Sequence, residues 1–137
     1  LCTNADCEEF MRTSVPPRVS KAYFSVDPIN FGAAENCNKF PRIRVIFGDG
    51  YQKEFVDSIP NFDIIIDDGP HSKESHLKSL DIYLSKLNEG GVFVIEDISD
   101  MEWTEEYKTK VPPWMSYEII DAREISGMSD SIMFVVR

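Results

Sequence analysis

Apolar residues recur along the chain in two patterns. Short runs of valine, isoleucine and phenylalanine predict β-strands, whereas leucines spaced by three or four residues predict a helix. The strands are expected at residues 22–27, 43–47, 62–67, 92–95, 117–122 and 131–136. Helices are expected at residues 8–14, 52–58, 72–87 and 99–110. Alternating strands and helices predict an α/β fold, and the last two strands, with no helix between them, predict an antiparallel hairpin at residues 117–136.

The centre of the chain holds an unbroken apolar run, Ile64, Ile65 and Ile66. A continuous run of β-branched residues is typical of a strand that is buried on both faces, as in a parallel sheet. The chain of 137 residues is near the usual size for one hydrophobic core. We therefore expect a single domain over residues 1–137, a three-layer α/β sandwich around a mostly parallel sheet.

Polar side chains follow two of these strands at the point where each strand ends. Asp67, Asp68 and His71 follow the isoleucine run, with a Gly-Pro turn between them, and Asp97 follows the next buried strand. Because the carboxyl ends of parallel strands meet at one sheet edge, Asp68 and Asp97 should lie side by side. Carboxylates beside an imidazole suit a metal site or a general base. The alternative is that these acids cap helices or are simply solvated.

This stretch resembles class I S-adenosylmethionine-dependent methyltransferases, and more narrowly the metal-dependent O-methyltransferases that act on sugars of macrolides. The family carries an Asp-Asp-Gly-Ser-His motif after its fourth strand and a Glu-Asp pair after its fifth. The chain matches the first motif with Pro70 in place of serine, and the second with Glu96 and Asp97. The resemblance implies a Rossmann-like fold. It also implies a divalent metal, expected to be Mg²⁺, on Asp68 and Asp97, with His71 as the general base.

The resemblance also implies where S-adenosylmethionine would bind. Asp27, at the end of the second family strand, would bind the ribose hydroxyls, although an acid before a proline also suits a simple turn. The implied cofactor-binding residues are Thr3, Asn4, Asp27, Asp49, Gly50, Asp67 and Asp68. In the first loop, Cys2 and Asp6 replace glycines of the family. The first family strand would lie upstream of Leu1, so we expect a split sheet that a partner segment or a second copy could complete.

The net charge of the chain limits the kinds of molecule that it is expected to bind. The formal net charge is −10 and the sequence pI is about 4.6, so the basic surface that a nucleic-acid binder needs is not visible. An anionic membrane would also repel such a chain, which leaves small molecules and other proteins. Three cysteines, Cys2, Cys7 and Cys37, form no zinc-binding or disulfide pattern. With no signal peptide and no apolar run of membrane-spanning length, we expect a reducing, cytoplasmic location.

Two functions remain open after these observations. The first is a metal-assisted O-methyltransferase acting on a hydroxyl group of a small, sugar-type molecule. The alternative is a catalytically inactive methyltransferase-like domain that serves as a structural or assembly module. A nucleotide-dependent dehydrogenase is a weaker third hypothesis, because the chain lacks a Gly-x-Gly-x-x-Gly motif. Outside the motifs, Ser72 is expected to cap a helix, His76 to be solvated, and Trp103 to be a packing residue.

A substitution at Asp27 tests the implied cofactor site. Asp27→Ala should weaken S-adenosylmethionine binding by about 1–3 kcal/mol, the scale for losing a charged hydrogen-bond acceptor. Titration calorimetry measures this change directly. Unchanged affinity would remove Asp27 from the site.

Overall fold

The computed structural model describes residues 22–26, 43–47 and 49–137, with side chains from Asp49 onward. The predicted helix at residues 8–14 and the three cysteines lie outside the described residues. The chain divides into two compact units, Leu1–Gln52 and Lys53–Arg137, and each is described by itself. The expectation of a single domain stays a prediction.

The first unit contains two of the predicted strands. Strand β1 (Ala22–Val26) pairs in parallel with β2 (Ile43–Phe47), so that Ala22 lies opposite Ile43. Both strands were predicted from their apolar residues, and the parallel pairing agrees with an α/β fold. In the described residues these two strands form a two-stranded sheet, and the expected split of the sheet stays a prediction.

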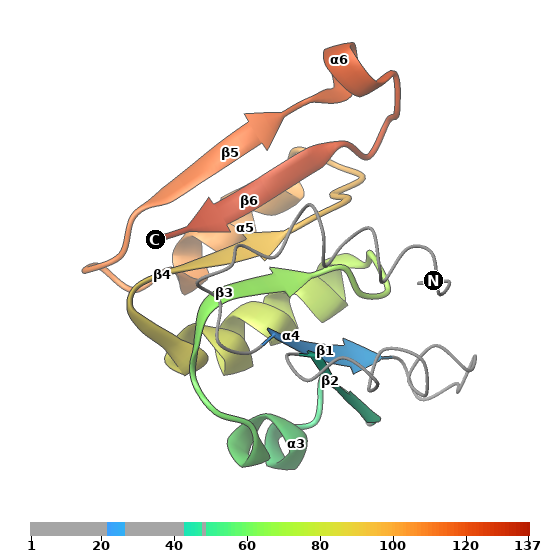
Figure 1. Cartoon of the computed structure of the whole chain (residues 1–137). Helices are drawn as coiled ribbons and strands as arrows, with labels where there is room; N and C mark the ends of the chain where they lie inside the picture. The colour runs from blue at the N-terminus through green and yellow to red at the C-terminus, as the bar shows by residue number, and fades with distance from the viewer. Residues whose placement is uncertain (1–21, 27–42, 48) are drawn as a thin grey trace. The chain divides into compact units, whose positions relative to one another are not determined.

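The second unit is a four-stranded mixed sheet with helices (Figure 1). Its strands lie in the order β3-β4-β6-β5; β3 and β4 are parallel, and β6 is antiparallel to both of its neighbours. The hairpin of β5 and β6 confirms the prediction for residues 117–136. The elements are α3 (Lys53–Ser58), β3 (Phe62–Asp67), α4 (Lys73–Tyr83), the 3₁₀ helix η1 (Leu84–Lys86), β4 (Leu87–Ile95), α5 (Trp103–Lys110), β5 (Tyr117–Asp121), α6 (Arg123–Ser126) and β6 (Ile132–Val136).

Helices α4 and α5 pack on one face of this sheet and form the core with it (Figure 1). The leucines of α4 supply one side of the core, and β4 and β6 supply the other. Tyr107 of α5 packs edge to face on Phe134, with ring centroids 5.6 Å apart. The buried cluster consists of Leu80, Leu84, Phe93, Ile95, Ile98, Tyr107, Ile132, Phe134 and Val136.

One expectation about the central strand is wrong. Ile64 and Ile66 were predicted to be buried, but they are 65% and 56% exposed. Ile65, which points to the opposite face, packs against the core cluster. Successive side chains of a strand point to opposite faces, so only one face of β3 is covered by the helices α4 and α5.

The start of β4 lies earlier than the apolar pattern predicts. The strand begins at Leu87, whereas the apolar run predicted a strand at residues 92–95. A side chain at Gly91 would meet two backbone oxygens, because its Cβ would lie 2.9 Å from Asn88 O and 3.1 Å from Asp63 O. A glycine is therefore required where β4 runs beside β3.

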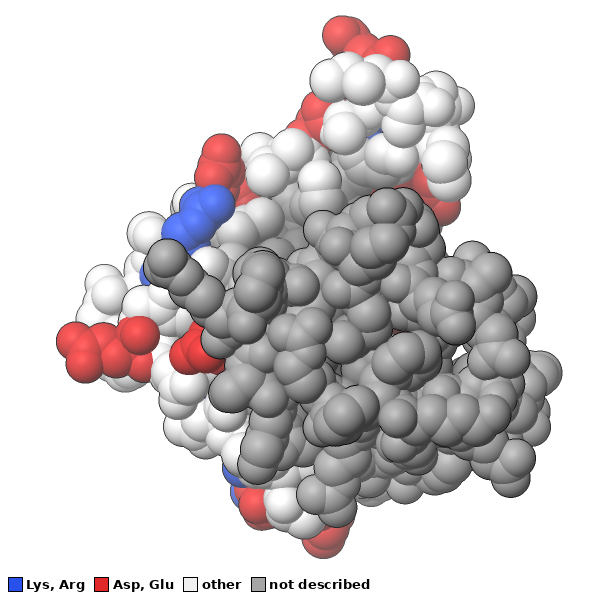
Figure 2. All heavy atoms as spheres, in the orientation of Figure 1, with Lys and Arg blue, Asp and Glu red and all other residues white. Residues whose placement is uncertain are grey.

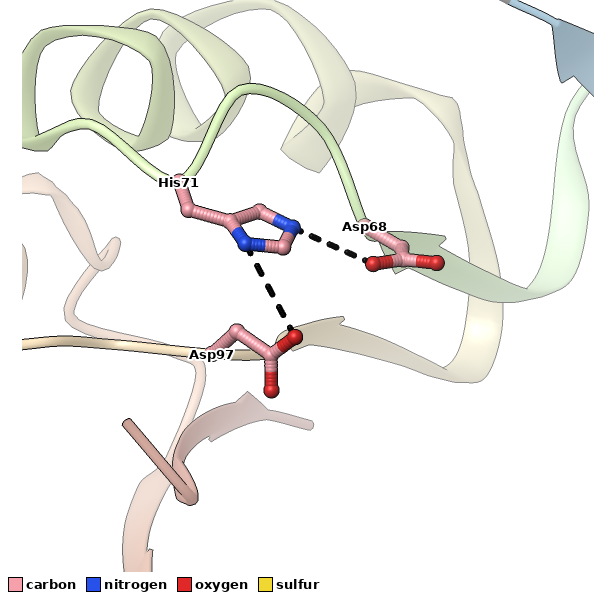
Figure 3. Close-up of side chains that lie close together, drawn as sticks. All are labelled: Asp68, His71 and Asp97. Carbon is pink, nitrogen blue, oxygen red and sulfur yellow. Dashed lines mark hydrogen bonds and ion pairs between the residues drawn. The ribbon is translucent and has the colours of Figure 1, made fainter. Parts of the chain in front are cut away.

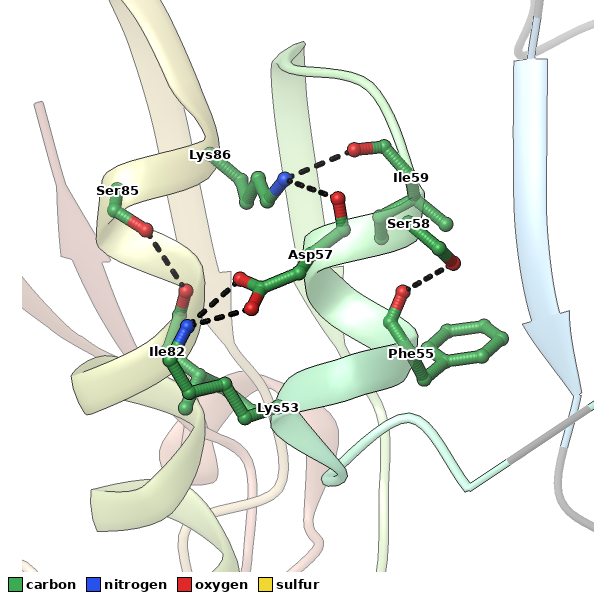
Figure 4. A network of polar contacts seen from close by, with 8 residues as sticks. All are labelled: Lys53, Phe55, Asp57, Ser58, Ile59, Ile82, Ser85 and Lys86. Atoms are coloured by element: carbon green, nitrogen blue, oxygen red, sulfur yellow. Dashed lines mark hydrogen bonds and ion pairs between the residues drawn. The ribbon is translucent and has the colours of Figure 1, made fainter.

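A lysine stabilises the end of α3 (Figure 4). Lys86 Nζ donates hydrogen bonds to the carbonyl oxygens of Ile59, at 2.9 Å, and Asp57, at 3.4 Å. The last carbonyls of a helix have no partner within the helix, so a cation there satisfies them and also interacts well with the helix dipole. This contact joins α3 to the turn that leads into β4.

The described surface is mainly acidic. Figure 2 shows more Asp and Glu than Lys and Arg on the face in view. Among the described residues, no helix combines the length and the apolar character needed to cross a membrane.

Removing a core ring tests this packing. Phe93 is fully buried and stacks on Tyr83 at 6.5 Å between ring centroids. Phe93→Ala should lower the free energy of unfolding by about 3–5 kcal/mol, measured by urea denaturation. As a control, Ile125→Ala should change it by less than about 0.5 kcal/mol, because Ile125 is 91% exposed. Equal effects of the two substitutions would contradict the assigned core.

Candidate metal and general-base site

The parallel pairing of β3 and β4 creates the candidate site. Asp67, the last residue of β3, lies opposite Ile95, the last residue of β4. The backbone N–H of Glu96 donates to the carbonyl oxygen of Asp67 at 3.1 Å, which holds the two strand ends together. Asp68 and Asp97 therefore begin neighbouring loops, as the sequence predicts.

The imidazole of His71 lies between the two carboxylates (Figure 3). Its Nε2 atom is 3.2 Å from Asp68 Oδ1, and its Nδ1 atom is 3.7 Å from Asp97 Oδ2. The side chains of His71 and Asp97 are each 35% exposed, whereas that of Asp68 is 69% exposed. The group is thus partly enclosed but remains open to a ligand on the Asp68 side.

Backbone conformation sets two of these residues apart. His71 has φ of 51° and Asp97 has φ of 53°, and they are the non-glycine residues with positive φ in the described part of the chain. Left-handed backbone costs most residues about 1–2 kcal/mol, although His and Asp adopt it more readily than others. Such conformations cluster at functional sites, where the surrounding structure holds them in place.

The helix that follows His71 begins with a well-formed cap. Ser72 Oγ accepts a hydrogen bond from Ser75 N at 3.1 Å, and Ser75 Oγ accepts one from Ser72 N at 3.2 Å. This reciprocal capping box confirms Ser72 as the N-cap of α4. Because His71 directly precedes the cap, the start of α4 fixes where its backbone lies.

Negative charge gathers around the imidazole. Burial raises the pKa of the Glu96 carboxyl; the nearby charges of Asp68 and Asp97 raise it further, while His71 lowers it. Carboxylates this close repel one another unless a cation or a proton lies between them. Either a proton or a cation would relieve this repulsion.

The three side chains suit a divalent metal by donor type. Asp68, His71 and Asp97 each offer one ligand atom, and these atoms lie within 4.8 Å of one another. Ligands of one Mg²⁺ lie about 2.1 Å from it, and hence at most about 4.2 Å from each other. Ligand atoms at the 4.8 Å limit would have to move closer together to share one Mg²⁺. Oxygen donors suit Mg²⁺ or Mn²⁺, and an added imidazole suits later transition metals as well.

The structure places the other predicted site residues in different surroundings. The turn at Gly69 and Pro70 brings His71 and Asp68 to hydrogen-bond distance. Asp67 was predicted to bind cofactor beside Asp68. Its Oδ2 atom is buried, since consecutive residues at a strand end point in opposite directions, and its role in cofactor binding stays a prediction.

The adenine-binding prediction involves the first unit. Asp49 Oδ1 accepts a hydrogen bond from Tyr51 N at 2.9 Å, and its Oδ2 atom accepts one from the Gln52 side chain at 2.8 Å. Both oxygens thus stabilise the turn that contains Gly50. Thr3, Asn4 and Asp27 lie outside the described residues.

His76 was expected to be solvated, and this is wrong. The ring is fully buried, and its Nδ1 atom forms a 2.9 Å hydrogen bond with the hydroxyl of Tyr107. Burial lowers the pKa of His76, with a smaller opposing effect from Asp67. Burial also raises the pKa of Tyr107. The signal in the sequence was the spacing of His76, Leu80 and Leu84, which places His76 on the buried stripe of the helix.

Two sugar O-methyltransferases resemble part of the chain. The mycinamicin VI 2''-O-methyltransferase of Micromonospora griseorubida is 39% identical over 66 residues, which are 45% of this chain and 16% of that protein. The 8-demethyl-8-alpha-L-rhamnosyl tetracenomycin-C 2'-O-methyltransferase of Streptomyces olivaceus is 28% identical over 75 residues, which are 52% of this chain and 20% of that protein. The matches span a fifth or less of these relatives. No protein-family model matches the chain.

Solved structures are similar over a larger part of the chain. A protein described as an rRNA methylase from Clostridium thermocellum has a TM-score of 0.67 at 16% identity, covering 100% of this chain and 82% of that one. Fibrillarin from Aeropyrum pernix, solved with S-adenosyl-L-methionine bound, has a TM-score of 0.61 at 13% identity, covering 98% of this chain and 62% of that one.

The chain has the Rossmann-like fold of class I methyltransferases. Within that fold it resembles the sugar O-methyltransferases, as the motifs at Asp67–His71 and Glu96–Asp97 predict. In this methyltransferase-like chain the Asp68–His71–Asp97 group lies at the carboxyl ends of two adjacent parallel strands, where open α/β sheets bind ligands.

The buried histidine predicts a pH dependence of stability. Because burial lowers the pKa of His76 from 6.5, the unfolded chain binds more protons than the folded chain between that lowered pKa and about 6.5. The free energy of unfolding should therefore be greatest above about pH 6.5 and should fall as the pH falls through this window. Urea denaturation between about pH 7.5 and pH 5 measures the slope. His76→Asn should flatten it; an equal slope in the variant would assign the effect to another group.

Proposed function

We propose that the chain is part of an S-adenosylmethionine-dependent O-methyltransferase that acts, with a divalent metal, on a hydroxyl group of a small sugar-type molecule. The observation that carries the proposal is the group of Asp68, His71 and Asp97, with two carboxylates on either side of one imidazole. The names of the two curated relatives support the same chemistry and the same class of acceptor.

Methyl transfer from a sulfonium needs an oxygen nucleophile in line with the methyl group. The oxygen–carbon bond forms as the carbon–sulfur bond breaks, and the hydroxyl proton must leave. In the proposed mechanism His71 accepts that proton, because a neutral imidazole is the usual proton acceptor near neutral pH. Asp68 and Asp97 would hold Mg²⁺, which would lower the pKa of the hydroxyl group. His71 would have to turn from Asp68 to meet the substrate, since the two are now in contact.

The proposed cofactor site keeps the residues that the resemblance implies. Asp27 would hold the ribose, Asp49 and Gly50 the adenine, and Thr3 and Asn4 the methionine end; Asp68 would border the cofactor as well. Asp49 would need to exchange one of its turn hydrogen bonds for the ligand. Asp67 would contribute through its other carboxylate oxygen, because its Oδ2 atom is buried.

The acidic charge favours a small acceptor over RNA. Some structural neighbours are named for rRNA, but similarity at 16% identity shows only the fold. RNA binding needs a basic surface, and the formal net charge is −10. We accordingly propose a small-molecule acceptor.

We also propose a reducing cytoplasmic setting for the protein. A partner segment or a second copy of the chain would complete the expected split sheet.

A second candidate function is an inactive methyltransferase-like module for assembly. It is favoured by the replacement of loop glycines by Cys2 and Asp6 and by the turn that occupies both oxygens of Asp49. Titration calorimetry with S-adenosylmethionine, with and without magnesium, separates the two functions. Binding supports the enzyme, and no heat in either condition supports the module.

Two substitutions test the proposed roles separately. His71→Ala should reduce turnover by roughly 10²–10⁴-fold, the usual size of general-base catalysis, and should leave S-adenosylmethionine affinity unchanged. Asp97→Asn should instead raise the magnesium concentration needed for half-maximal activity. Asp81→Asn is the control, because Asp81 lies on the exposed surface of α4 and pairs with Lys110. Full turnover in His71→Ala would remove His71 from the mechanism.

A further inference from the structure

A buried polar contact joins the two helices that follow the candidate site. His76 lies on α4 and Tyr107 on α5, and both side chains are fully buried. Their hydrogen bond, 2.9 Å between Nδ1 and the hydroxyl oxygen, spans 31 residues of sequence. Neither residue of this hydrogen bond is a proposed metal ligand or the proposed general base.

His76 is connected through α4 to His71, and Tyr107 is connected through α5 to Asp97. His71 precedes the N-cap of α4, and His76 N donates to Ser72 O at 3.0 Å within the first turn of that helix. Asp97 leads through the buried Ile98 to α5, whose first residue, Trp103, packs edge-on against the His76 ring at 6.3 Å between centroids. A shift between α4 and α5 would therefore change the separation of His71 and Asp97.

Two ion pairs also join α4 and α5, and both are exposed. Lys73 pairs with Glu106 at 2.5 Å and Lys110 pairs with Asp81 at 2.9 Å, with side chains that are 34% to 53% exposed. Exposed ion pairs stabilise a structure little, because water competes for both partners. The buried bond has no such competitor, and breaking it would leave two polar groups unsatisfied in the core.

The orientation of the His76 ring depends on this bond. In the part of the chain that the structure describes, the Nε2 atom of His76 has no hydrogen-bond partner. The hydroxyl of Tyr107 is thus the polar contact that orients the imidazole, with the Tyr107 and Trp103 rings on its edges. The His76 ring is also close enough to the site for the charge of His71 to lower its pKa.

We infer that His76 and Tyr107 are positioning residues whose hydrogen bond holds the loop of Asp97 against the start of α4, so that Asp97 stays beside His71 and Asp68 as the proposed metal site requires. This inference rests on the proposed metal-assisted function. The left-handed backbone of both His71 and Asp97 must be held by surrounding structure, and the α4–α5 contact supplies that support on the helix side.

Tyr107→Phe tests the inference, because it removes one hydroxyl and keeps the ring. Asp81→Asn is the matched control, since it breaks the exposed tie between the same two helices. In the full chain, Tyr107→Phe should bind Mn²⁺ about tenfold more weakly, the lower end of the effect of residues that orient metal ligands. Asp81→Asn should leave Mn²⁺ affinity unchanged. Calorimetry with Mn²⁺ alone measures both.

A second readout does not depend on metal. The sequence has two histidines, so their imidazole NMR signals can be assigned with His76→Asn. Tyr107→Phe should move the signals of His71 without metal, and Asp81→Asn should not. His76→Asn, whose amide can still bond Tyr107, should retain more Mn²⁺ affinity than Tyr107→Phe, and it provides the comparison if Tyr107→Phe does not fold.

The outcomes distinguish the two proposals. If the native chain does not bind Mn²⁺, the metal-assisted function fails, and the His71 signals still decide whether the pair positions the site. If Tyr107→Phe lowers stability but leaves both Mn²⁺ affinity and the His71 signals as in Asp81→Asn, the pair is only structural and the inference is overturned. Weaker Mn²⁺ binding by His76→Asn than by Tyr107→Phe would also contradict it.

Discussion

The parallel pairing of β3 with β4 is the constraint on which the candidate site depends. With Asp67 opposite Ile95, both strands end at the same level, so the acids that follow them begin neighbouring loops. A shift of one residue would turn the side chains of a strand to the opposite face. The bond from Glu96 N to Asp67 O continues the pairing beyond the strands and holds this register.

Several features of the site are unfavourable to folding by themselves. The backbone is left-handed at His71 and Asp97, and carboxylates are grouped around one imidazole. The core beneath offsets these costs, with Ile95 and Ile98 fully buried on either side of the Glu96–Asp97 pair. Ile98 N also donates to Ile132 O at 3.1 Å, which fixes the loop to β6. Such a conflict between local preference and global fold is typical of a binding or catalytic site.

The local geometry of the site supports the proposed function more than overall similarity does. The curated relatives match over 66 to 75 residues, and the solved structures share the fold at low sequence identity. A fold hosts many activities, so the chemistry has to come from the arrangement of particular groups. Here that arrangement is an imidazole held between two carboxylates by a turn on one side and a strand end on the other.

The sequence by itself determined the strands, the hairpin and the grouping of Asp68, His71 and Asp97. Strand type follows from local runs of β-branched residues, and strand ends from the polar residues that interrupt them. Burial was decided by the tertiary structure. Ile64 and Ile66 remain exposed although they are apolar, and His76 is buried although it is polar. The exposure of Ile64 and Ile66 depends on which face of β3 is covered by another element. The burial of His76 depends on a hydrogen-bond partner distant in sequence, Tyr107. Local periodicity encodes neither of these two conditions.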